Sequence, residues 1–214
     1  MIVVLFVVGG CLIFIDPIQS FLIKRLNNDL LQVSAEEMKN NATSDAAGVS
    51  FDFNDAVTLS IEDVLKAQFN RDDLYALGSI VVPSVKLHLP IVKGVSKYAL
   101  AVGAGTMKPD QKMGQGNYAL AGHYFKDKSD LLFSPLYGVE IGDSVFITNK
   151  TSVYEYKISS KQVIDATDVH IIDDVHDETR LTLITCANDG VDRLAIQAQF
   201  VKEHSFEDLQ DELF

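Results

Sequence analysis

Three hydrophobic patterns follow one another along the chain. An unbroken apolar run fills residues 1–15, helical spacing continues to about residue 75, and short β-type runs divided by Gly, Pro, Asn and Asp make up most of the rest. Apolar residues that recur every three to four positions are typical of helices, whereas strict alternation is typical of half-buried strands. The pattern therefore predicts a helical N-terminal part and a β-rich main domain.

The N-terminal apolar run predicts a membrane anchor over residues 1–23. The run is shorter than the roughly 20 residues of a spanning helix, so a secretory signal is the alternative. A cleavable signal needs a basic segment before the core and a small-x-small site after it, and neither is present. No Lys or Arg precedes Ile2 to fix the orientation, so we expect the true start to lie upstream. Asp16-Pro17 is interpreted as a helix breaker.

Two helices joined by a polar linker form the predicted stalk, residues 24–75. The first helix covers residues 21–39, and the linker follows over residues 40–48. The second helix begins at Ser60, a good N-cap followed by acidic residues in the first turn.

A β-rich main domain is predicted over residues 76–204, followed by an acidic tail over residues 205–214. The expected strands cover residues 79–82, 85–91, 117–121, 144–148, 153–164, 180–185 and 194–201. Seven or eight short strands in about 130 residues indicate an all-β barrel or sandwich. A short helix is expected over residues 96–102.

Composition narrows the classes of function. The formal net charge of -12 argues against nucleic-acid binding, because contacts with phosphate need a basic surface. The sequence has no glycine-rich phosphate loop, no CxxC pair and no His-x-x-x-His, so nucleotide and zinc sites lack support. Its two cysteines are Cys11, in the apolar run, and Cys186. If residues 16–214 are exported, they hold a single thiol and cannot form an internal disulfide.

Cys186 closes one apolar run, and Arg193 begins the next. The Asn-Asp-Gly sequence at residues 188–190 is a strong turn signal, so we expect an antiparallel hairpin with Cys186 opposite Arg193. Strand partners lie about 5 Å apart, where a guanidinium favours a thiolate or stabilises an oxyanion. Arg180 is the other candidate for this arginine, but six residues of strand put it about 20 Å from Cys186. The alternative to a reactive Cys186 is a buried, inert thiol at the end of a strand.

The five histidines supply candidates for a proton carrier. His123 is the best candidate, because it follows a predicted strand and sits beside two small residues that let another segment approach. His88 alternates with apolar neighbours, which predicts a solvent-facing side chain. The others lie in polar loops or in the tail: His170, His176 and His204.

Three motifs, in the same chain order, resemble those of the sortases. They are Ala-Leu-Ala-Gly-His at residues 119–123, Thr-Leu-Ile-Thr-Cys at residues 182–186, and Arg193. The resemblance runs from about residue 76 to residue 202. It implies an eight-stranded β-barrel outside a Gram-positive cell membrane, held by a single-pass N-terminal helix.

The resemblance also implies a transpeptidase that cleaves an LPxTG sorting signal between Thr and Gly. Cys186 would attack the Thr carbonyl, His123 would protonate the leaving amine, and Arg193 would hold the substrate and stabilise the oxyanion. An amine of a cell-wall precursor would then resolve the thioacyl intermediate. The expected partners are therefore surface proteins that bear LPxTG, and the cell-wall precursor whose amine is the acceptor. Three further residues match positions that line the groove for the sorting signal in the sortases: Ala121, Ile184 and Thr185.

The anchor at the N-terminus, without a hydrophobic C-terminal segment, resembles class A enzymes. Pilus-building class C enzymes usually carry an Asp-Pro-aromatic lid, whereas Asp16-Pro17 precedes Ile18. Some class A members bind calcium through acids in the loop before the His strand. Residues 107–115 hold one acid and two lysines here, and Ca²⁺ needs several oxygen ligands, so we expect no cofactor.

Two other classes of function stay open. A thiol hydrolase would share the thioacyl step but use water as the acceptor. A non-enzymatic, membrane-tethered β-domain would leave Cys186 inert.

Overall fold

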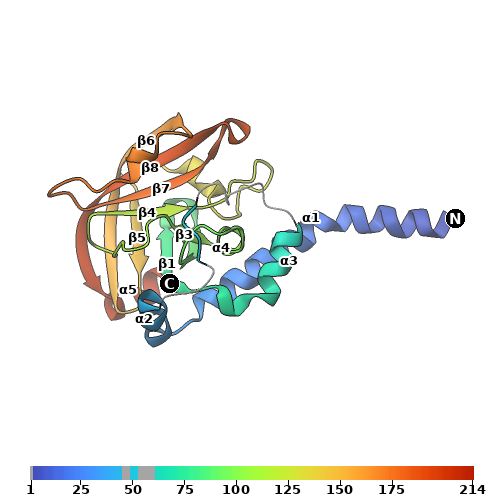
Figure 1. Ribbon diagram of the computed structural model, residues 1–214, viewed down its shortest axis with the longest axis horizontal. Coiled ribbons are helices and arrows are strands. Elements are labelled where there is room, and N and C mark those ends of the chain that lie inside the picture. Colours follow the sequence, from blue (N-terminus) through green and yellow to red (C-terminus); the bar gives the residue numbers. More distant parts are fainter. Residues whose placement is uncertain (1, 45–48, 53–60) are drawn as a thin grey trace.

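The computed structural model describes the backbone of residues 2–44, 49–52 and 61–214 (Figure 1). Side chains of residues 1–15, 61 and 72 lie outside this description. Within it, the strands form one closed barrel in the order β1-β2-β3-β4-β7-β8-β6-β5, so the predicted eight-stranded barrel is confirmed. The strands are β1 (Ala76–Val82), β2 (Leu87–Val92), β3 (Ala104–Thr106), β4 (Asn117–Ala121), β5 (Ser144–Thr148), β6 (Ser152–Asp165), β7 (Arg180–Ala187) and β8 (Asp192–Ser205).

Each predicted run became a strand, and the eighth strand, β3, was not predicted. A strand of three residues is too short to show the alternation of apolar and polar positions. β3 nevertheless closes the barrel, because it pairs in parallel with β2 and antiparallel with β4. The core within the barrel is apolar, and its largest fully buried side chains include Tyr156, Phe133, Ile80, Ile91 and Leu120.

The pairing of β4 with β7 decides where the functional motifs meet. These strands run parallel, with Ala121 beside Ile184. Their C-terminal ends therefore reach the same rim of the barrel. β7 and β8 form the predicted hairpin, in which Cys186 is the register partner of Arg193.

Within the described residues, five α-helices pack around the barrel, and α1 projects away from it (Figure 1). They are α1 (Ile2–Leu31), α2 (Ala35–Thr43), α3 (Ile61–Phe69), α4 (Lys97–Val102) and α5 (Phe206–Leu213). The second stalk helix and the short helix before β3 lie where the sequence predicts them. α3 packs against α1, and Gln68 Nε2 donates to the Leu22 carbonyl at 3.2 Å.

The single helix predicted over residues 21–39 is wrong, because the structure has two helices there. Lys150 Nζ donates to the carbonyls of Leu31 and Val33 at 2.7 and 2.8 Å, which satisfies acceptors at the end of α1. Ser34 then starts α2, because its hydroxyl accepts from the Glu37 N–H at 3.2 Å.

The interpretation of Asp16-Pro17 as a helix breaker is also wrong, because Pro17 lies inside α1. The helix continues past the ring, and Ser20 Oγ donates to the Asp16 carbonyl at 3.0 Å. The predicted anchor covers residues 1–23, and the side chains of residues 1–15 lie outside the described part of the structure. Within the described part of the chain, none of the helices has the length and apolar character needed to span a membrane.

His88 is half-buried, which corrects the predicted solvent-facing position. The C-terminal segment forms α5 and brings the Phe214 ring to 5.8 Å from the His88 ring. Burial consequently lowers the pKa of His88.

Gly122 connects β4 to His123 and packs directly on Phe133. A Cβ at position 122 would lie 2.6 Å from Phe133 Cγ, and Phe133 is fully buried. We expect Gly122→Ala to lower the free energy of unfolding by about 1–3 kcal/mol, because overpacking forces the surroundings to move. Denaturant unfolding measures this loss. Gly138→Ala is the control, since a Cβ there meets only the Val85 side chain at 3.3 Å. Equal stability of the two variants would contradict this account.

Candidate active site

One cavity at the barrel rim brings the predicted site residues together. Its volume is about 120 Å³. The predicted residues that line it are Ala121, His123, Ile184, Thr185, Cys186 and Arg193. They come from the ends of β4 and β7 and from the start of β8, so the parallel pairing and the hairpin together build the site.

The cavity walls are apolar apart from the three catalytic candidates, Thr185 and two aspartates. The apolar lining consists of Leu100, Met107, Ala121, Gly122, Ile164, Ala166, Val169, Ile171, Ile172 and Ile184. Several of these residues belong to the β6–β7 loop, residues 166–179, which includes the 3-10 turn η5 (Val169–Ile172). Such a cavity suits aliphatic side chains with few charges.

Cys186 is a free, partly exposed thiol, and its exposure leaves the sulfur accessible. Arg193 is held beside it by the turn at residues 188–190. Arg193 Nη1 donates to the carbonyls of Gly190 and Asp192 at 2.8 and 2.9 Å. These bonds fix the guanidinium while engaging only Nη1 among the described contacts. The remaining guanidinium N–H groups can donate to an oxygen of a bound molecule.

Two hydrogen bonds brace the strand end that carries the thiol. The buried Thr185 hydroxyl donates to the Gly122 carbonyl at 2.7 Å, so it joins β7 to the end of β4. Tyr137 Oη donates to the Cys186 carbonyl at 3.0 Å. The contribution of Tyr137 was not predicted, because nothing in the local sequence links this loop tyrosine to Cys186.

His123 is buried, with 9% of its surface exposed. Desolvation lowers the pKa of His123 to about 4, and the Asp63 carboxylate opposes this effect. Nε2 is buried and has no hydrogen-bond partner among the described residues. Burial therefore favours a neutral imidazole in the resting protein, with a nitrogen available to accept a proton.

The remaining candidates lie elsewhere. Arg180 starts β7, at the end opposite Cys186, and forms an ion pair with Glu178. The other histidines have their own partners, namely Phe214 for His88, Asp173 for His170, Asp177 for His176 and Glu155 for His204. Across the described ranges, no cluster of three or more His, Cys, Asp or Glu residues has the arrangement of a metal site.

Comparison with known proteins decides the family. The Sortase domain matches residues 80–201, which contain all the residues at the cavity that the motifs predicted. The chain belongs to the sortase family. Sortase A of Streptococcus agalactiae is 36% identical to this sortase over 211 residues, covering 96% of this chain and 85% of the relative. Sortase A of Listeria monocytogenes is 38% identical over 186 residues, covering 86% and 82%.

Solved structures agree with this assignment. Sortase A of Listeria monocytogenes has a TM-score of 0.58 and 39% identity, and the match covers 61% of this chain and 90% of that chain. Sortase C-1 of Streptococcus pneumoniae shares the fold at 16% identity, with a TM-score of 0.60 and coverage of 84% and 96%. The family and the sortase A relatives together identify a class A-like cysteine transpeptidase.

The burial of His123 predicts how stability depends on pH. Above pH 6.5 the imidazole is neutral in both states. Between pH 6.5 and about 4 the unfolded chain binds the proton while folded His123 does not, so stability falls as the pH falls. We expect wild type to lose about 2 kcal/mol more than His123→Gln between pH 7.5 and 5. Denaturant unfolding at both pH values measures this difference. A constant difference would contradict the burial argument.

Proposed function

We propose that this sortase cleaves an LPxTG-type signal between Thr and Gly and transfers the Thr carbonyl to an amine. The observation that carries the proposal is the convergence of Cys186, His123 and Arg193 on one cavity with largely apolar walls. The Leu and Pro side chains of the signal suit those walls, and its scissile carbonyl lies beside the thiol. Ala121 and Ile184 contact the signal, while Thr185 acts by bracing the strand ends.

The acylation step follows from the chemistry of these groups. Cys186 Sγ attacks the Thr carbonyl carbon as its proton passes to the neutral His123 imidazole. Arg193 donates to the oxyanion of the tetrahedral intermediate. The intermediate collapses to a thioester as the C–N bond breaks, and His123 returns the proton to the departing glycine amine.

The second half-reaction reverses the sequence with a new amine. The amine attacks the thioester carbonyl, His123 takes the proton from nitrogen, and Cys186 leaves and regains a proton. Amide formation therefore needs no external energy source, because the thioester conserves the reactivity of the cleaved bond. An amine of a cell-wall precursor is the proposed acceptor.

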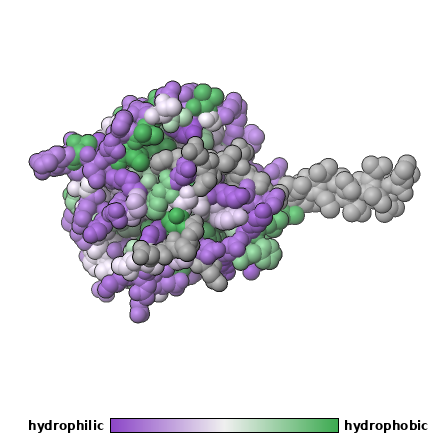
Figure 2. All heavy atoms as spheres, in the orientation of Figure 1, coloured by the Kyte–Doolittle hydropathy of each residue, from purple (hydrophilic) through white to green (hydrophobic). Residues whose placement is uncertain are grey.

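The same proposal places the enzyme at the outer face of the cell membrane. Residues 2–15 are apolar, and α1, which contains them, projects away from the barrel (Figure 1). Exposed apolar residues continue from this helix onto α3, namely Ile18, Phe21, Leu65 and Phe69. Figure 2 shows hydrophobic residues beside the base of the projecting helix. A single-pass anchor would put this surface next to lipid.

Substitutions at the three candidate residues test the assigned roles. We expect Cys186→Ala to abolish cleavage and transfer, and His123→Ala to lower kcat/KM by about 10²- to 10⁴-fold. Arg193→Lys should lower kcat/KM at least about tenfold, because an ammonium lacks the planar fork. Turnover of an LPxTG peptide, with and without an added amine, measures both steps.

The exposed His176→Ala serves as the control and should retain activity. A greater loss in this variant than in His123→Ala would exclude His123 as the proton carrier. Release of free acid at an undiminished rate in excess amine would favour the hydrolase. Transpeptidation by Cys186→Ala at a tenth of the wild-type rate would rule out covalent catalysis at that thiol.

Calcium provides an independent test of the loop before β4. Lys108, in this loop, pairs with Asp174 at 2.7 Å, which places a positive charge where a cation would need oxygen ligands. We expect EDTA or added calcium to change the turnover rate by less than about threefold. A tenfold rise on adding calcium would show that the loop gathers a calcium ion despite the lysine.

A further inference from the structure

The backbone pairing of β4 with β7 stops before it reaches the thiol. Among the described contacts, this ladder ends with the bond from the Gly122 N–H to the Ile184 carbonyl at 3.1 Å. Carbonyls two residues apart in a strand point to the same side, so the Cys186 carbonyl also faces the side that β4 has left. The chain turns away after Gly122, because the His123 carbonyl accepts from the Phe133 N–H at 3.0 Å.

A tyrosine side chain takes the place of the missing strand. Tyr137 lies in the 3-10 turn η4 (Ser134–Gly138), and its Oη donates to the Cys186 carbonyl at 3.0 Å. Its ring packs on the ring of Tyr124, with the two centroids 4.6 Å apart. Tyr124 directly follows His123. One side chain thus contacts the residue that carries the thiol and the neighbour of the imidazole.

Strand β6 holds Tyr137 in turn. Lys161 Nζ donates to the carbonyls of Tyr137 and Val139 at 2.7 and 3.0 Å, which satisfies acceptors at the end of η4. β6 also pairs with β8, where Ile164 is the register partner of Arg193. The turn that carries the tyrosine is therefore attached to the same strands that build the site.

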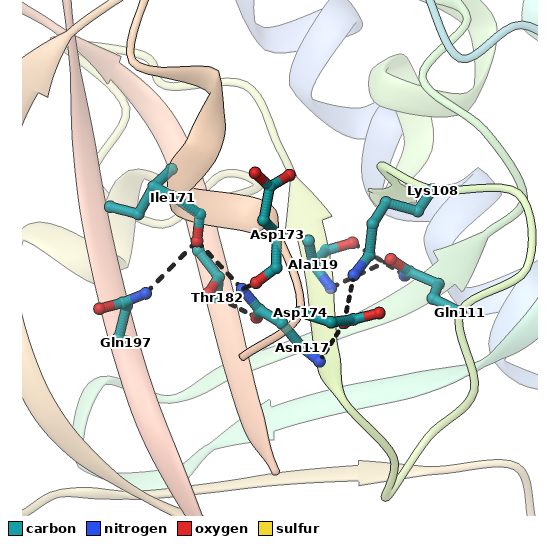
Figure 3. A network of polar contacts seen from close by, with 9 residues as sticks. All are labelled: Lys108, Gln111, Asn117, Ala119, Ile171, Asp173, Asp174, Thr182 and Gln197. Carbon is teal, nitrogen blue, oxygen red and sulfur yellow. Dashed lines mark hydrogen bonds and ion pairs between the residues drawn. The ribbon is translucent and has the colours of Figure 1, made fainter. Parts of the chain in front are cut away.

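Side chains of the two strands themselves fix the opposite end of the β4–β7 pair (Figure 3). Asn117 is fully buried, and its Oδ1 accepts from the Thr182 hydroxyl at 2.7 Å. Its Nδ2 donates to the carbonyls of Ile171 and Asp173 at 3.0 and 3.1 Å. Breaking these bonds would leave buried polar groups unpaired. We therefore expect the freedom of the strand pair to lie at the rim, where Tyr137 replaces the backbone partner.

We propose that Tyr137 is a positioning residue, whose hydroxyl extends the β4–β7 ladder beyond the end of β4 and so fixes the Cys186 thiol relative to His123. The inference rests on the proposed function for the roles of Cys186 and His123. Tyr137 does not line the cavity and acts through the Cys186 backbone. Strand ends with few bonds open locally, and a displaced reacting group slows the chemical step. Loss of the hydroxyl should therefore lower kcat and spare KM, because the cavity walls stay in place.

Tyr137→Phe tests the proposal, because it keeps the ring that packs on Tyr124 and removes the hydroxyl. We expect kcat for an LPxTG peptide to fall about three- to tenfold, with KM within about twofold of wild type. Labelling of Cys186 by a thiosulfonate reagent should stay within about twofold, since the sulfur remains accessible. Tyr98→Phe is the matched control. It removes a tyrosine hydroxyl from α4, away from Cys186, and should keep the wild-type kcat.

Hydrogen exchange of residues 185–188 gives a readout that needs no turnover. Exchange there should become faster in Tyr137→Phe and stay unchanged in Tyr98→Phe.

Lys161→Met gives a second route to the same bond, because it frees η4 and leaves the tyrosine intact. It should lower kcat in the same direction. The double variant with Tyr137→Phe should be no slower than Tyr137→Phe alone, since residues that act through one contact are not additive.

Unchanged kcat and unchanged exchange in Tyr137→Phe would overturn the proposal, as would an equal loss of kcat in Tyr98→Phe. A rise in KM without a loss of kcat would also contradict it, because that result places Tyr137 in binding. Multiplied losses in the double variant would exclude a shared path through Tyr137. If Cys186→Ala still turns over the peptide, the proposed function fails. The exchange measurement still decides whether Tyr137 holds the end of the strand.

Discussion

The parallel pairing of β4 and β7 is the constraint on which the rest of the site depends. Because the two strands point the same way, the residues that follow β4 and those that end β7 meet at one rim. His123 and Cys186 are separated by 62 intervening residues of sequence, yet both line one cavity. The Thr185 hydroxyl locks this arrangement by bonding the Gly122 carbonyl at 2.7 Å. Arg193 reaches the same rim because it is the register partner of Cys186 in the β7–β8 hairpin.

Burial gives His123 properties that a surface histidine lacks. The same desolvation that disfavours the imidazolium keeps Nε2 away from water and without a described partner. An imidazole in this state accepts a proton readily only when charge develops nearby, as it does when the thiol attacks. In the proposed mechanism, Arg193 donates to the oxygen of the attacked carbonyl, where negative charge develops. The proposal thus assigns proton transfer to His123 and stabilisation of the oxyanion to Arg193, which line one cavity.

Local patterns predicted much of this fold and site. The strands and the hairpin depend on alternation and on one turn sequence, and Cys186 and Arg193 pair as expected. The β4–β7 pairing depends on a long connection, so local pattern could not predict it. β3 is too short to show a period, and Pro17 was misread because its helix continues past the ring. His88 became half-buried because the distant Phe214 packs against it, and Tyr137 reaches Cys186 through tertiary structure alone.

Trapping the covalent intermediate tests the central claim most directly. The protein is incubated with an LPxTG peptide in the absence of an amine, quenched in acid and measured by intact mass spectrometry. The account predicts an added mass equal to the peptide acid that ends in Thr less one water, located on Cys186 by peptide mapping. Cleavage of the peptide with no adduct on Cys186, or with the adduct on another residue, would contradict it.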